Sequence, residues 1–315
     1  MITIQPLSPE DAPAVAAMRE ATAAHKGDEL GPEARPMFDG MFAATPAAPD
    51  VRVETATVGG IAGFWLRPPN ARPGARMLYL HGGGYVLGSA QAFTNFVGQI
   101  ALRAGADTFV PDYRLAPEHP FPAAIDDAVA VYRGLVADGA ERIVVAGDSA
   151  GGGLTLALLS ILAADKTGGV VQPVGAAVMS PLTDLALAGE SFETRAEADP
   201  IFTRDVLQAF SDMYLHGQDA TLPKASPLYA RLHGLPPIRI DVGDNEVLLA
   251  DSVRYANRAQ AAGVEITLSV WEGMAHVFQS SLGQFRAAEQ SVNAIGEFLR
   301  QRLNDAVASN ALKGA

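Results

Sequence analysis

The sequence contains no cysteine and has few basic residues. Among its 315 residues, 23 are Lys or Arg and 35 are Asp or Glu, so the formal net charge at pH 7 is -12. The lack of cysteine excludes disulfides, thiolate zinc sites and a cysteine nucleophile. The excess of negative charge argues against a protein that binds nucleic acid or an anionic membrane surface.

Long hydrophobic runs are also missing. No stretch approaches the roughly 18 consecutive apolar residues of a membrane span, and the first residues, MITIQPLSPEDAPAV, do not place a basic segment before an apolar one as a secretion signal does. Hydrophobic residues nevertheless make up 49% of the chain, enough for a large core. These features predict a globular, cytoplasmic protein without a membrane span.

Apolar, strand-like segments alternate with helical patterns along most of the chain. Short connections between such units predict an α/β fold with a mostly parallel central sheet and helices on both faces. A polar, helix-prone insertion interrupts the alternation at 185–235. The strand-like segments after the first two, which lie at 51–58 and 62–69, are RMLYLHGGGY, DTFVPDYRLAP, RIVVAGDSAGG, GAAVMSPLTD, PIRIDVGDNE and EITLSVWEG.

Ser149 lies in the sequence GDSAG (147–151), directly after a strand-like segment. Ligands of such sheets bind beyond the carboxyl ends of the strands. The G-x-S-x-G spacing is typical of a sharp strand-to-helix turn that exposes a nucleophilic serine. A glycine-rich turn whose serine only caps the following helix would show the same residues, so the assignment depends on partner motifs elsewhere.

A second motif, HGGG (81–84), ends another predicted strand. A nucleophilic serine needs backbone N–H groups directed at the carbonyl oxygen as it becomes an oxyanion, and glycine lets the backbone approach closely. We expect Ala150, the residue after the nucleophile, to provide one N–H group, and Gly83 and Gly84 to provide the others. His81 is expected to be a structural residue of this loop.

The serine also needs a base that accepts its proton. Of the six histidines, His276 in VWEGMAHVFQ follows the last predicted strand and therefore lies at a carboxyl end. A histidine after the final strand matches the chain order Ser, acid, His of α/β hydrolases. We therefore predict that His276 is the base.

Five motifs in this order, HGGGY, DYRLAPEHPFPAA, GDSAGG, GDNEVLLADS and GMAHVF, carry a resemblance to a known family. Between about residues 50 and 300 the sequence resembles the bacterial hormone-sensitive-lipase-like carboxylesterases of the α/β-hydrolase superfamily. The resemblance implies a cofactor-free serine esterase that acts on small-molecule esters with short-to-medium acyl groups. We expect no metal site.

The resemblance also implies a helical cap over the site. It predicts cap helices at 1–45, the first part of the catalytic domain at 46–184, a cap insertion at 185–220 and the second part of the catalytic domain at 221–315. Four apolar residues of the insertion at helical spacing, Phe202, Val206, Phe210 and Met213, predict an apolar stripe. EITLSVWEG is expected to be an exposed edge strand, through which related esterases often form homodimers.

More than one carboxylate in the sequence could be the triad acid. Asp184 follows an earlier strand and is expected to be structural at the cap entry. Asp241 falls within the predicted strand and Asp251 within the next predicted helix, which leaves Asp244 and Glu246 in the loop after IRIDVG. The family more often has an aspartate followed by proline, a pattern this chain lacks. Alignment to the family favours Glu246, which lies 30 residues before His276, with Asp244 as the alternative.

Other functions remain compatible with the same residues. A serine elbow and an oxyanion hole do not select the leaving group, so a lactone, thioester or amide hydrolase would use the same triad. A non-catalytic protein that binds a small ligand with this fold is disfavoured because His276 is present.

Overall fold

The computed structural model describes residues 1–28, 30–165 and 171–313, and only the backbone of the last seven of these. Within these residues one nine-stranded sheet has the order β1-β9-β8-β7-β6-β4-β5-β3-β2. Its strands are β1 (Ile2–Gln5), β2 (Arg52–Val58), β3 (Ile61–Arg67), β4 (Ala75–Leu80), β5 (Asp107–Pro111), β6 (Arg142–Asp148), β7 (Gly175–Met179), β8 (Ile238–Gly243) and β9 (Ile266–Trp271). Only the β2–β3 and β3–β5 pairs of this sheet are antiparallel.

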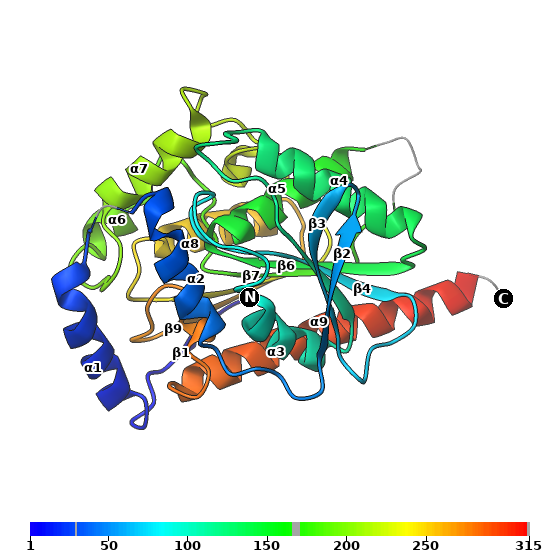
Figure 1. Ribbon diagram of the computed structural model, residues 1–315, viewed down its shortest axis with the longest axis horizontal. Coiled ribbons are helices and arrows are strands. Elements are labelled where there is room, and N and C mark those ends of the chain that lie inside the picture. Colours follow the sequence, from blue (N-terminus) through cyan, green and yellow to red (C-terminus); the bar gives the residue numbers. More distant parts are fainter. Residues whose placement is uncertain (29, 166–170, 314–315) are drawn as a thin grey trace.

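Helices cover both faces of the sheet, which confirms the predicted α/β-hydrolase fold class (Figure 1). They are α1 (Ala12–Thr22), α2 (Arg35–Ala43), α3 (Thr94–Ala104), α4 (Ala123–Ala137), α5 (Ser149–Ala164), α6 (Ser191–Thr194), α7 (Arg204–Leu215), α8 (Leu249–Ala261) and α9 (Arg286–Lys313). Short 3₁₀ turns lie at Ala23–His25, Pro32–Ala34, Pro227–Tyr229 and Phe278–Ser280. None of the helices in the described part of the chain is long and apolar enough to cross a membrane.

The central strands are buried on both faces because helices pack on each side. Successive side chains of a strand point to opposite faces, and β4 shows the consequence. Its Leu78 and Leu80 belong to the core beneath α4, α5 and α8, whereas Met77 and Tyr79 belong to the core beneath α3 and α9. All four side chains are fully buried. Near-continuous apolar runs in the sequence are thus explained by two cores that share one sheet.

The predicted edge strand is wrong. β9 pairs with β8 on one side and with β1 on the other, in parallel, so that Ile4 lies opposite Val270. The N-terminal residues give little sequence signal for a strand because β1 has only four residues, two of them exposed. A homodimer that pairs through β9 is therefore excluded in this structure, since β1 occupies that edge.

The two segments predicted as a cap lie together at the carboxyl ends of the strands, where α1, α2, α6 and α7 gather in Figure 1. Their contacts include hydrogen bonds from Lys26 Nζ to the Ala196 carbonyl (2.6 Å) and from Arg19 to the Ala198 carbonyl. The N-terminal segment and the insertion therefore support each other, although they are about 170 residues apart in sequence.

The predicted stripe on the insertion is partly wrong. The buried face of α7 includes Val206 and Phe210, as predicted, and it continues through Tyr214, while Met213 is only half-buried against the same core. Phe202 lies before the helix, since Thr203 caps it by accepting a hydrogen bond from the Val206 N–H. The prediction assumed that the helix extends back through Phe202, and the cap shortens it.

Candidate active site

Ser149 lies at the turn between β6 and α5, in the middle of the sheet. Its φ angle is +52°, a left-handed conformation that costs a non-glycine residue about 1 kcal/mol or more. Gly151 packs so closely on the end of β4 that a Cβ atom there would lie 2.0 Å from the Leu80 carbonyl oxygen and 2.3 Å from that of His81. The glycine therefore permits the close approach that holds the turn in its strained form.

Three predicted residues form one chain of hydrogen bonds. His276 Nε2 lies 2.9 Å from Ser149 Oγ, and His276 Nδ1 lies 2.7 Å from Glu246 Oε2. An ionised carboxylate can only accept, so Nδ1 carries a proton and Nε2 of the neutral ring is free to accept the serine proton. Glu246 is fully buried, and Ser149 is 9% exposed. The arrangement can deliver a proton from the hydroxyl to the imidazole.

The carboxylate of Glu246 is held at its second oxygen as well. Oε1 accepts hydrogen bonds from the Ser180 hydroxyl (2.8 Å) and from the Gly243 N–H (2.7 Å). Ser180 Oγ in turn accepts from the Val277 N–H, next to His276 (3.1 Å). Ser180 thus connects the acid to the segment that carries the histidine. Sequence reasoning missed it, although its place directly after the strand segment GAAVM was an available signal.

The competing carboxylates face other partners. Asp244 accepts from the Gly273 N–H (2.7 Å), and its own carbonyl accepts from Arg195 Nε (2.8 Å). Asp184 is fully buried and pairs with Arg254 at 2.7 Å. Of the three candidate acids, Glu246 is the one whose side chain meets His276.

The predicted oxyanion residues come from two neighbouring strand ends. Ala150 lies in the first turn of α5, where backbone N–H groups have no partner within the helix. The glycine loop after β4 is fastened to the same turn, since the Gly82 N–H donates to Asp148 Oδ1 (3.1 Å). Gly84 has a φ of +63°, and a Cβ atom there would lie 2.7 Å from the Phe210 ring of α7. The loop is therefore enclosed between the elbow and the insertion.

His81 is buried beside the site but belongs to the scaffold. Its ring stacks on Tyr113 with centroids 4.4 Å apart, and Nδ1 lies 2.8 Å from the Gly82 carbonyl oxygen. Burial lowers the pKa of His81 to about 4, against a smaller opposing effect of the Gly82 carbonyl. The ring is therefore neutral at pH 7 and supports the glycine loop.

The charge state of His276 depends on three carboxylates. Burial lowers the pKa of His276, but Glu246, and then Asp199 and Asp148, raise it, and the net direction is upward from 6.5. Asp148 is part of the motif GDSAG, and burial raises its pKa to about 6. Asp199 belongs to the insertion, and nothing in the sequence indicated that it lies near the histidine.

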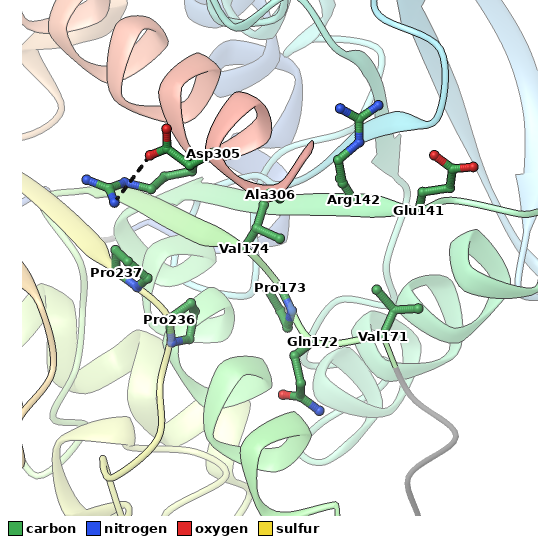
Figure 2. A pocket seen from close by; sticks show the side chains of 11 residues that line it. Glu141, Arg142, Val171, Gln172, Pro173, Val174, Pro236, Pro237, Asp305 and Ala306 are labelled. Carbon is green, nitrogen blue, oxygen red and sulfur yellow. Dashed lines mark ion pairs between the residues drawn. The ribbon is translucent and has the colours of Figure 1, made fainter. Parts of the chain in front are cut away.

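No group of three or more His, Cys, Asp or Glu side chains in the described part of the chain could hold a metal ion. A separate hollow of about 580 Å³ lies at the amino ends of β6, β7 and β8, beside α9 (Figure 2). Its Arg142 donates to the Pro73 and Leu303 carbonyls, and its Arg302 pairs with Glu265. The hollow is at the opposite end of β6, a strand roughly 20 Å long, from Ser149.

Comparisons with known proteins agree with this geometry. Residues 77–280 match the model of a family described by the α/β hydrolase fold. The chain is 38% identical over 249 residues to an acetyl-hydrolase of Streptomyces hygroscopicus, covering 78% of this chain and 82% of the relative. It is 34% identical over 273 residues to an esterase of Acinetobacter venetianus, covering 85% and 89%.

Solved structures give the same result. The crystal structure of EstE5 soaked with ethyl alcohol matches with a TM-score of 0.87 and 41% identity, covering 95% of this chain and all of that one. An esterase from the bacterial hormone-sensitive lipase family matches with a TM-score of 0.86 and 39% identity, covering 94% and 99% of the two chains.

Proposed function

The chain belongs to the bacterial hormone-sensitive-lipase-like esterases of the α/β-hydrolase superfamily, and from this membership we propose that it hydrolyses short-to-medium acyl esters through an acyl-Ser149 intermediate. The relatives are named esterases, carboxylesterases and acetyl-hydrolases. The observation that carries the proposal is the pair of hydrogen bonds that joins Glu246, His276 and Ser149.

Acylation begins when His276 Nε2 accepts the proton of Ser149 Oγ while this oxygen attacks the ester carbonyl carbon. The carbonyl oxygen becomes an oxyanion, which the N–H groups of Gly83, Gly84 and Ala150 stabilise, each donor contributing about 3 kcal/mol in comparable sites. The bond to the alkoxy oxygen then breaks, and the imidazolium gives its proton to the departing alcohol. The acyl group remains on Ser149.

Deacylation repeats these steps with water. His276 accepts a proton from a water molecule that attacks the acyl carbonyl, and then returns the proton to Ser149 Oγ as the acid is released. Glu246 remains ionised throughout, because it orients the ring and stabilises the imidazolium without taking its proton. Its three hydrogen-bond partners support this role.

The proposal is tested by replacing the nucleophile. Hydrolysis of p-nitrophenyl butyrate should be abolished in Ser149→Ala, because only the hydroxyl is lost, and mass spectrometry should show that a serine-directed phosphonate no longer labels the chain. Ser160→Ala is a matched control in the same helix, since this hydroxyl donates to the Leu156 carbonyl. Labelling that persists in Ser149→Ala would contradict the assignment.

The same assay separates the alternatives. If the protein hydrolyses lactones, thioesters or amides but not p-nitrophenyl esters, the triad assignment stands and the assignment as an ester hydrolase is wrong. A protein that binds esters without releasing nitrophenol would be a binding module. The cytoplasmic location and a homodimer stay predictions, and the dimer, if light scattering detects it, must use a contact other than β9.

A further inference from the structure

Side chains of the cap insertion form hydrogen bonds with the loop that carries Glu246. Three side chains of the insertion, spaced four residues apart at 191, 195 and 199, hydrogen-bond to the backbone of residues 244–250, here called the acid loop. Ser191 donates to the Val247 carbonyl and accepts from the Ala250 N–H (3.0 Å). Arg195 Nε donates to the Asp244 carbonyl (2.8 Å).

Asp199 makes the contact nearest to the acid. Its Oδ2 accepts a hydrogen bond from the N–H of Val247, the residue after Glu246, at 2.8 Å. Its Oδ1 accepts from the N–H groups of Ile201 and Phe202, both at 2.8 Å. The side chain is fully buried. Burying a carboxylate costs several kcal/mol unless it is hydrogen-bonded, and the three N–H donors supply those bonds.

Phe202, which provides one of these N–H donors, also packs against the base His276. The Phe202 ring meets the His276 ring edge-to-face, with centroids 5.0 Å apart and an interplanar angle of 84°. Such pairs stabilise by about 0.5–1.5 kcal/mol beyond their buried area. The Asp199 carboxylate thus holds two neighbours of the base–acid pair at once, Val247 beside Glu246 and Phe202 against His276.

We propose that Asp199 is a positioning residue of the esterase site, whose buried carboxylate fixes the acid loop and Phe202 around the base–acid pair. This inference rests on the proposed role of His276 as the base. The carboxylates that raise the pKa of His276 come from three separate elements: Glu246 from the acid loop, Asp199 from the insertion and Asp148 from the elbow.

The charge of Asp199 has a defined consequence for the reaction. The imidazole becomes an imidazolium in each transition state, so a buried carboxylate nearby stabilises the transition state more than the ground state. Asp199 is among the groups that raise the pKa of His276. Removing its charge should lower that pKa. The acid limb of kcat/KM, which reports the loss of neutral His276 in the free enzyme, should then move to lower pH.

The decisive measurement is the titration of His276 by NMR in the wild type, Asp199→Asn and Asp199→Glu, with the resonance assigned by its absence in His276→Gln. Asp199→Asn keeps the size of the side chain and one carbonyl acceptor but removes the charge, so the titration of His276 in this variant tests the charge, and the readout does not require activity. Asp219→Asn is the matched control, because Asp219 also accepts a backbone N–H within the insertion, that of Thr221 (2.8 Å), but is not among the groups that shift His276.

We expect the pKa of His276 in Asp199→Asn to fall by about half a unit or more, a change typical of losing one nearby charge. The acid limb of kcat/KM should move with it, and kcat for p-nitrophenyl butyrate should fall about tenfold with KM nearly unchanged. Asp199→Glu should restore the titration at least in part, and Asp219→Asn should behave as the wild type.

An unchanged His276 titration in folded Asp199→Asn would overturn the proposal. Asp199→Ser, whose hydroxyl can still accept from the turn amides, takes its place if the asparagine variant does not fold. Loss of the fold in both variants would also contradict the proposal, since Asp199 would then serve folding. If the pKa of His276 falls in Asp199→Asn as expected but the wild type does not hydrolyse the ester, the proposed role of Asp199 stands and the proposed function is refuted.

Discussion

Two acidic side chains lie two residues apart in the acid loop and have different surroundings. Glu246 is fully buried and points at His276, whereas Asp244 is half-buried and caps the Gly273 N–H. The Gly243 N–H and the Ser180 hydroxyl hold one oxygen of the Glu246 carboxylate, so that the other oxygen meets His276 Nδ1. The local backbone thus decides which carboxylate meets the base.

This difference predicts the effect of neutralising each residue. Glu246→Gln keeps the side-chain shape but replaces an acceptor by an amide that can stabilise the wrong tautomer of His276, so kcat should fall by about three to four orders of magnitude. Asp244→Asn should cost much less, because that carboxylate serves one backbone N–H. Steady-state kinetics on p-nitrophenyl butyrate check both. A dead asparagine variant beside an active glutamine variant would reassign the acid.

At the scale of single residues, the sequence was most informative where a motif dictates the backbone. Ser149, Gly83, Gly84 and His276 could be placed at strand ends because glycine-rich turns and chain order are local signals. Asp199 could not, because its contacts with Val247 and Phe202 exist only after the insertion has folded over the acid loop. Tertiary contacts between distant segments have no local pattern.

Among the secondary-structure elements, boundaries and short strands were the least predictable. β1 has only four residues, and it forms because the N-terminus reaches an open strand edge 265 residues away, where the Met1 ammonium donates to the Ile266 carbonyl (2.6 Å). α5 begins at Ser149 itself, because the helix follows directly from the strained turn. The longer apolar strands were predicted because two buried faces require apolar side chains.

The close packing of α5 on the end of β4, at Gly151, yields another prediction. Gly151→Ala would place a Cβ atom 2.0 Å from the Leu80 carbonyl oxygen, a backbone atom that cannot move without shifting the glycine loop. We expect a loss of stability of about 2 kcal/mol or more, as for other overpacked sites, with a large loss of kcat. Thermal unfolding and turnover measured together check this.

Gly40→Ala is the matched control for this substitution. Gly40 lies inside α2, and nothing stands within 4 Å of a Cβ atom built there. Replacing a helical glycine with alanine stabilises by about 0.5–1 kcal/mol, so the control should melt at an equal or higher temperature with activity retained. A Gly151→Ala protein as stable and active as the control would show that the turn tolerates a side chain.

For the whole molecule, the mostly parallel sheet could be predicted but its strand order could not. Repeated strand–helix units require parallel neighbours, yet nothing local indicates that β4 lies between β5 and β6 or that β1 joins β9. The contacts between the N-terminal helices and the insertion were expected only through the family resemblance. They join the N-terminal segment to the mid-chain insertion, and the two together form the predicted cover over the site.

This cover should restrict the acyl chain. Phe202 packs on His276 and Phe210 packs on Gly84, so apolar rings from the insertion lie against both the base and the oxyanion loop. Tyr214 of α7 stacks on Tyr85, the residue after that loop, with centroids 3.8 Å apart. Space next to the reacting carbonyl is therefore bounded by rigid aromatic contacts, and Ser149 is only 9% exposed.

We therefore expect p-nitrophenyl esters with acyl chains of about two to eight carbons to be the best substrates. Each added methylene that remains buried contributes about 0.8 kcal/mol of binding, so kcat/KM should first rise with chain length. Once the chain outgrows the enclosed space, it must displace packed aromatic rings, which costs more than the added burial provides. The rate should then fall at least about tenfold by the palmitate ester. Ser149→Ala, run at the same detergent concentration, corrects for spontaneous hydrolysis. Faster cleavage of palmitate esters or triglyceride emulsions than of butyrate would show that the insertion does not limit the acyl group.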